Sequence, residues 1–132
     1  MTSGYLLDTS VLSLLAPGRM PTDAPVVAWL KTWRHACFIS AVTVMEIEQG
    51  VRKLRRTGAV QKAEVLNAWL DRLVAATDAR VLDFDARVAR AAGEISERAM
   101  AIGRHPGFAD VAIAATAFTH GLVLLTCNDR HF

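Results

Sequence analysis

Carboxylate side chains that could act together in a reaction occur at separate places in the chain. Asp8 directly follows the apolar residues 5–7, and Glu46, Asp110 and the pair Asn128–Asp129 come later. No Lys or Arg stands next to Asp8, Glu46 or Asp110 in the sequence. Carboxylates that converge on one cleft repel each other unless a cation compensates their charge. Oxygen ligands favour Mg²⁺ or Mn²⁺ over zinc, so these residues predict a divalent-metal site if the fold brings them together.

The segment around Asp8 has the pattern of a strand, a tight turn and a helix. The apolar run 5–7 ends in Asp8, Thr9 and Ser10, and apolar residues then recur at helical spacing as far as Ala16. Asp8 is therefore predicted at the carboxyl end of a strand, the edge where open α/β sheets bind ligands. Asp, Thr and Ser are also good helix caps, so a purely structural role for Asp8 is an alternative.

Strand-like and helix-like segments alternate along the chain. Four compact apolar runs predict strands, at residues 5–7, 37–40, 80–84 and 122–125. Asp85 is expected to cap the helix after the third strand, and a further helix should begin at Phe108. This alternation predicts a three-layer α/β/α fold with a central parallel sheet of four to five strands. The carboxyl edge of that sheet would then collect the acidic residues and Asn128.

Glu46 falls on the predicted helix after the second strand, beside the apolar stripe that should face the sheet. Gly50 follows one turn later, and a glycine in mid-helix costs about 1 kcal/mol relative to alanine. Close approach by another backbone or by a ligand could justify that cost. The helix ends in a basic run that includes Arg52, Lys53 and Arg56. These cations either form a solvated helix end favoured by the helix dipole or hold the phosphates of a substrate.

Glu94 and Glu97 are excluded as site residues. They fall on the outer face of a predicted helix, where Arg90, Glu94 and Arg98 form i,i+4 pairs. Such pairs are ordinary surface chemistry.

Size and composition indicate one folded domain, residues 1–132. Apolar residues make up 52% of the chain, and the net charge of +2 means that attraction to nucleic acid must come from local clusters. No apolar run is long enough to cross a membrane, and the N-terminus lacks a signal-peptide pattern. We therefore expect a cytoplasmic protein with no membrane partner. Cys37 and Cys127 are expected to be buried rather than metal ligands.

Four short motifs together resemble the PIN-domain family, and within it the VapC-type toxin ribonucleases of bacterial toxin–antitoxin systems. They are the segment 6–10, the segment 40–50 with Glu46, Asp110 with the residues after it, and the segment 126–128. The resemblance implies a PIN-like fold and a metal-dependent endoribonuclease that hydrolyses RNA phosphodiester bonds with Mg²⁺ or Mn²⁺. It also implies a homodimer and a cognate antitoxin protein that covers the active site.

Residue by residue, the resemblance assigns the acids of the site. Asp8, Glu46 and Asp110 match the family's first three acids, which are expected to be catalytic and to bind metal. Asn128 stands where relatives often carry a fourth acid, so a second metal ion would be held more weakly.

The resemblance and the basic run supply the remaining site residues. Ser10 and Thr126 match the family's supporting hydroxyl positions. Asp129 is adjacent to Asn128 and should point elsewhere, as a further supporting residue. The residues expected to bind the substrate are Arg52, Lys53 and Arg56.

Proteins of other classes offer competing interpretations. A haloacid-dehalogenase-like phosphatase needs a second Asp where this chain has Ser10. A receiver domain needs an acidic pair after the first strand and a Lys after the last, and neither is evident. The remaining alternative is a catalytically inactive PIN-like module that binds RNA or protein. The intact acids Asp8, Glu46 and Asp110 argue against it, and EDTA-sensitive cleavage of RNA would separate the two.

Overall fold

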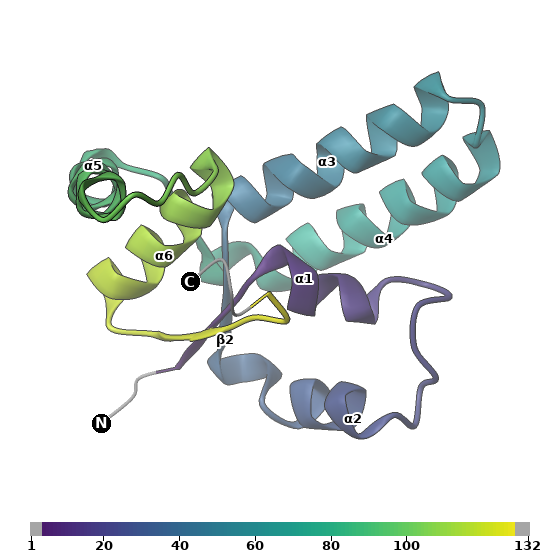
Figure 1. Ribbon diagram of the computed structural model, residues 1–132. Helices are drawn as coiled ribbons and strands as arrows, with labels where there is room; N and C mark the ends of the chain where they lie inside the picture. Colours follow the sequence, from purple (N-terminus) through teal and green to yellow (C-terminus); the bar gives the residue numbers. More distant parts are fainter. Residues whose placement is uncertain (1–3, 129–132) are drawn as a thin grey trace.

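The computed structural model describes residues 4–128, and a parallel β-sheet forms its centre (Figure 1). The strands are β1 Tyr5–Leu7, β2 Cys37–Ser40, β3 Val81–Leu82 and β4 Val123–Leu125. They are ordered β3-β2-β1-β4 across the sheet, and Tyr5 of β1 is in register with Cys37 and Val123. The predicted parallel sheet is confirmed with four strands in the described residues. A fifth strand after β4 would have to lie beyond residue 128, outside them.

Helices connect and cover the strands. Their bounds are α1 Thr9–Leu12, α2 Pro25–Thr32, α3 Ala41–Arg56, α4 Val60–Thr77, α5 Ala86–Ala101 and α6 Phe108–His120. In Figure 1, α3 and α4 run side by side as a hairpin that projects away from the strands, while α5 and α6 lie together on the opposite side. Within residues 4–128, no helix is both long and apolar enough to span a membrane.

The two faces of the sheet are buried by different helices because successive side chains of a strand point to opposite faces. Leu7 of β1 belongs to a core cluster with Leu12 of α1 and Leu70 of α4. Leu6, the residue before it, packs against Ile113 of α6. Helices therefore cover both faces, and the predicted three-layer α/β/α arrangement is confirmed.

Polar residues at the strand ends begin the helices, as the sequence suggests. Ser40 ends β2 and its Oγ accepts a hydrogen bond from Val42 N (3.0 Å), which caps α3. Asp85 Oδ1 accepts from Val88 N (3.0 Å), so the predicted cap of α5 is confirmed. At the other end of a helix, Gly121 adopts φ +65° and terminates α6, a conformation that glycine adopts without strain.

Two predicted boundaries are wrong by a few residues. The third strand was predicted over residues 80–84, but β3 covers only Val81–Leu82. Its pairing partner β2 ends at Ser40, which is in register with Leu82, so the ladder has nowhere further to extend. The first helix keeps α-helical form only to Leu12 and continues as a 3₁₀ turn over Ser13–Leu15.

Candidate active site

Asp8 lies directly after β1 and is only 4% exposed. Its Oδ1 accepts a hydrogen bond from Thr9 N (2.8 Å), which caps α1. Its Oδ2 accepts from the hydroxyls of Ser10 and Thr126, each at 2.8 Å. These donors use three of the roughly four acceptor positions of a carboxylate. Asp8 is therefore a helix cap, as the alternative interpretation required, and it keeps acceptor capacity for a ligand.

Ser10 and Thr126 join the end of β4 to the end of β1. Ser10 Oγ accepts from Cys127 N (3.0 Å), and Thr126 Oγ1 accepts from Asn128 N (2.9 Å). Each hydroxyl thus donates to Asp8 and accepts from the backbone, so both of its polar functions are used. The structure places both residues against Asp8, and their supporting role in catalysis stays a prediction.

Glu46 is half-buried on α3 and is held from the α1 side of the site. Thr9 Oγ1 donates to Glu46 Oε1 (2.5 Å) and lies 3.1 Å from the hydroxyl of Thr43. Thr43 is completely buried, so the Thr9 hydroxyl links Glu46 to the packed interior. The sequence alone indicates only a capping role for Thr9. Its one local signal as a site residue is its position between Asp8 and Ser10.

The predicted acids meet at one cavity, here called the carboxylate pocket, with a volume of about 570 Å³. It is lined by Asp8, Thr9, Ser10, Ser13, Leu14, Arg19, Glu46, Asp110, Cys127 and Asn128. Five of these residues are predicted site residues: Asp8, Ser10, Glu46, Asp110 and Asn128. Asp129, another predicted site residue, lies outside the described residues.

Arg19 is a basic residue of the site that comes from outside the predicted motifs. No basic residue is adjacent to the three acids in sequence, yet Arg19 lines the carboxylate pocket together with them. It lies in the segment between the 3₁₀ turn Ser13–Leu15 and α2. The pocket therefore has a cation of its own at its border, and this exposed arginine was not predicted.

The two cysteines differ in environment. Cys37 in β2 is buried, as expected, and burial raises the pKa of its thiol although the charge of Arg80 opposes the shift. The prediction that Cys127 is buried is wrong. β4 ends at Leu125, so Cys127 falls in the segment after the strand, where it is exposed and lines the carboxylate pocket.

The donor set of the carboxylate pocket suits a hard divalent cation. Asp8, Glu46 and Asp110 offer carboxylate oxygens and Asn128 an amide oxygen, the ligands that Mg²⁺ and Mn²⁺ prefer. In the described part of the chain, the side chains form no group of three or more Asp, Glu, His or Cys residues arranged to hold a metal ion. Mg²⁺ commonly binds through one or two carboxylates and keeps several waters, so the donors present fit it.

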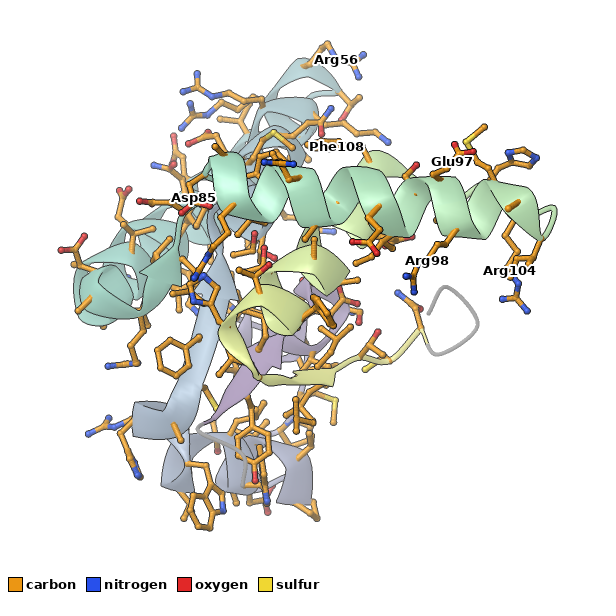
Figure 2. The ribbon with its side chains drawn as sticks, turned by 90° about the vertical axis from the view of Figure 1, so that its left-hand side faces the viewer. Arg56, Asp85, Glu97, Arg98, Arg104 and Phe108 are labelled. Carbon is orange, nitrogen blue, oxygen red and sulfur yellow. The ribbon has the colours of Figure 1, made fainter. Side chains whose placement is uncertain are left out.

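A second depression, here called the basic groove, begins at Glu46. It has a volume of about 500 Å³ and is lined by Glu46, Gln49, Gly50, Arg52, Lys53 and Arg56. The three predicted substrate-binding cations therefore line one depression, which shares Glu46 with the carboxylate pocket. Arg52 Nε is also paired with Glu48 at 2.9 Å on the surface. Arg56 lies at the far end of the α3–α4 hairpin (Figure 2).

The excluded acids Glu94 and Glu97 lie on α5, away from the carboxylate pocket. Both are exposed, and Glu94 Oε1 pairs with Arg98 Nη2 at 2.9 Å. Figure 2 shows Arg98 extending from the side of this helix. The interpretation of this face of α5 as ordinary charged surface is confirmed.

Comparison with known proteins agrees with this geometry. The chain is 37% identical over 129 residues to toxin FitB of Neisseria gonorrhoeae. It is 32% identical over 128 residues to VapC ribonuclease Y4jK of Sinorhizobium fredii. Each match covers 96% of this chain and 89% of the relative. The crystal structure of FitAcB from Neisseria gonorrhoeae superposes with a TM-score of 0.81 at 35% identity, over 97% of this chain and 90% of that one. A model of the PIN domain family matches residues 5–132. The chain belongs to the PIN domain family.

Proposed function

We propose that this protein is a metal-dependent endoribonuclease and the toxin of a toxin–antitoxin pair. The observation that carries the proposal is the carboxylate pocket, where Asp8, Glu46, Asp110 and Asn128 come together from four distant segments at the sheet edge. The relatives named as a toxin and as a ribonuclease support it. A depression lined by cations adjoins the same pocket, which suits a polyanionic substrate.

Asp8, Glu46, Asp110 and Asn128 are the residues that would hold Mg²⁺, with Mn²⁺ as a substitute. When bound, such an ion lowers the pKa of a water molecule and offsets the charge of the attacked phosphate. The chain's own contribution is to orient the ligands. Ser10 and Thr126 fix Asp8 Oδ2, and Thr9 fixes Glu46 Oε1. The neutral Asn128 contributes less attraction for a cation than an aspartate would.

Cleavage of RNA by the purified protein tests the proposal directly. We expect internal cuts in a mixed pool of single-stranded RNA when Mg²⁺ or Mn²⁺ is supplied, and loss of cutting when EDTA is added. Restoring an excess of Mg²⁺ should restore the activity, because the pocket residues provide the ligands. Binding of RNA without cleavage under all these conditions would instead support the alternative of an inactive PIN-like module.

The basic groove is expected to act in substrate binding rather than in chemistry. Replacing Arg52, Lys53 and Arg56 together by Gln should raise KM for RNA about tenfold and leave kcat within about twofold. Each lost phosphate contact removes one counterion-release term, so the slope of log(1/KM) against log[salt] should become shallower by about 2. Steady-state kinetics on a short RNA at several salt concentrations measures both quantities.

A matched control removes the same number of charges elsewhere. Arg87, Arg90 and Arg98 are exposed residues of α5 and do not line the basic groove. Their replacement by Gln should change the salt slope much less than the groove variant does. Equal changes in the two variants would mean that only overall charge matters, and a collapse of kcat with unchanged KM would rule out a phosphate-binding role for the groove.

The antitoxin is expected to combine an apolar segment with a basic residue. A cavity of about 760 Å³ between α1, α2 and α4 has apolar walls that include Leu12, Leu15, Leu30 and Leu73, which suit an amphipathic segment of a partner. An Arg from that partner could reach the carboxylate pocket and pair with two carboxylate oxygens at once.

We also propose a homodimer, consistent with the strongly exposed apolar residues Ile102 and Phe118.

A further inference from the structure

Gly50 is a glycine that the protein's own packing does not explain. It lies in the interior of α3, one turn after Glu46. A Cβ atom built on Gly50 would meet nothing within 4 Å beyond its own helix and chain neighbours. No neighbouring backbone in the described residues therefore approaches closely enough to require a glycine. The position is therefore open to a molecule outside the chain.

Two depressions meet at Gly50. One is the basic groove, and the other is a cavity of about 710 Å³ between α1, α3 and α4, here called the side cavity. Its walls are largely apolar and include Leu54 of α3 together with Val65, Leu66 and Trp69 of α4. Val65 is 52% exposed. The cavity volume lies within the range of about 300–1,000 Å³ for ligand sites. Together with the exposed apolar surface, it indicates space for a flat apolar group.

The side cavity adjoins the carboxylate pocket. Thr9, Ser13, Arg19 and Glu46 line both of them. A group seated in the side cavity is therefore a direct neighbour of a bond held at the carboxylates. Glu46 lines all three depressions, and Gly50 lines both the side cavity and the basic groove.

Polar side chains at the side cavity match a nucleotide. Arg19 and Lys62 are exposed and supply positive charge that complements a phosphate backbone. Gln61 is also exposed at the cavity, and its amide can both donate to and accept from a base edge. Proteins that bind single-stranded RNA combine such cations with aromatic surfaces on which bases stack, a role open to Trp69.

We propose that the side cavity is a binding site for the nucleobase of the nucleotide next to the scissile phosphate, and that Gly50 keeps its entrance open. The proposal rests on the ribonuclease function proposed above and adds a subsite to it. The substrate is a single strand, because a base must leave its stack to enter the cavity. Gln61 then gives the cleavage site a base preference, while the cations of the basic groove hold the phosphates on the other side of Gly50.

A side chain placed at Gly50 tests the subsite. Gly50→Leu places a bulky side chain where the side cavity and the basic groove meet. The variant should fold at least as stably as the natural protein, because leucine is a better helix former than glycine. Two substrates are compared: a single-stranded RNA with one cleavage site, and the same RNA with abasic nucleotides on both sides of the scissile phosphate. For the natural protein, removal of the bases should lower kcat/KM about tenfold, a loss typical of one base–aromatic contact.

Gly50→Leu should lower kcat/KM for the complete RNA by a similar factor, mainly through KM. Removal of the bases should then change kcat/KM of this variant by less than about twofold.

Gly93→Leu is the matched control. Gly93 is likewise in the interior of a helix, α5, with nothing within 4 Å of a built Cβ, and it does not line the side cavity. This control should keep the full base dependence. Gly50→Ala, with a smaller side chain, should show a base dependence between those of the natural protein and Gly50→Leu. If the leucine variant does not fold, the base dependence of Gly50→Ala tests the subsite.

Three outcomes would overturn the subsite. One is an unchanged kcat/KM of the natural protein when the bases beside the scissile phosphate are removed. Another is an equal loss on both substrates, since the leucine would then act by disturbing Glu46. The third is normal RNA cleavage combined with loss of inhibition by an antitoxin, since the cavity would then serve a protein partner. Failure of the natural protein to cut any RNA with Mg²⁺ is a different result, because it contradicts the proposed function itself.

Discussion

Replacing Asp8 by Asn is expected to lower kcat for RNA cleavage by about 10³-fold or more while leaving the protein folded. A factor of this size corresponds to roughly 4 kcal/mol of lost transition-state stabilisation. Asp8 is buried at the carboxylate pocket, so loss of its charge removes attraction for a cation at the place where water least screens it. Single-turnover cleavage of a labelled RNA with saturating Mg²⁺ measures the loss.

The fold should tolerate this change. Asn caps helices about as well as Asp, so its oxygen can keep the bond from Thr9 N now made by Oδ1. Its amide group can donate to the hydroxyls of Ser10 and Thr126, which can accept as well as donate. We expect the free energy of unfolding to fall by about 1 kcal/mol, measured by urea denaturation followed by circular dichroism.

Asp85→Asn is the control for the capping function of Asp8. Asp85 caps α5 through Val88 N but is exposed and does not line the carboxylate pocket. Because asparagine keeps this cap, the variant should lose little stability and keep full cleavage activity. If Asp8→Asn unfolds the protein, or if it leaves cleavage at the level of the control, Asp8 is a structural cap and the metal-binding role is wrong.

Much of the fold could be predicted because its strands are short apolar runs bounded by polar residues. The run 37–40 coincides with β2, and Ser40 both ends that strand and caps α3. The extent of β3 could not be predicted, because it depends on where its neighbour stops pairing. Pairing length is a property of two strands together, and the residues after Leu82 carry no local sign that the partner has ended.

The acids of the site could be placed together because parallel strands present their carboxyl ends at one edge of a sheet. Asp8 and Asn128 follow strands that are direct neighbours, β1 and β4. Arg19 could not be placed in this way, since it lies between α1 and α2 in a segment whose path no periodicity describes. The contact of Thr9 with Glu46 was equally hidden, because it joins side chains 37 positions apart.

Glu46→Gln is expected to lower kcat about 10²-fold and to raise the Mg²⁺ concentration needed for half-maximal activity. The glutamine oxygen can still accept the hydrogen bond from Thr9 Oγ1, so shape and orientation are kept while the charge is lost. Glu46 also lines the basic groove and the side cavity, but removal of a negative charge does not weaken attraction for a polyanion, so RNA binding should not fall with catalysis. A titration of activity with Mg²⁺, together with RNA binding measured without cleavage, separates the two effects.

Glu97→Gln supplies the comparison for this charge removal. Glu97 is an exposed residue of α5 and should be neutral within about twofold in kcat, since a surface charge of this kind contributes little. Equal losses in the two variants would show that net charge, rather than position, controls the activity. If Glu46→Gln lowers RNA binding but leaves kcat and the Mg²⁺ requirement unchanged, Glu46 belongs to the substrate surface alone, and Asp8, Asp110 and Asn128 would have to hold the cation without it.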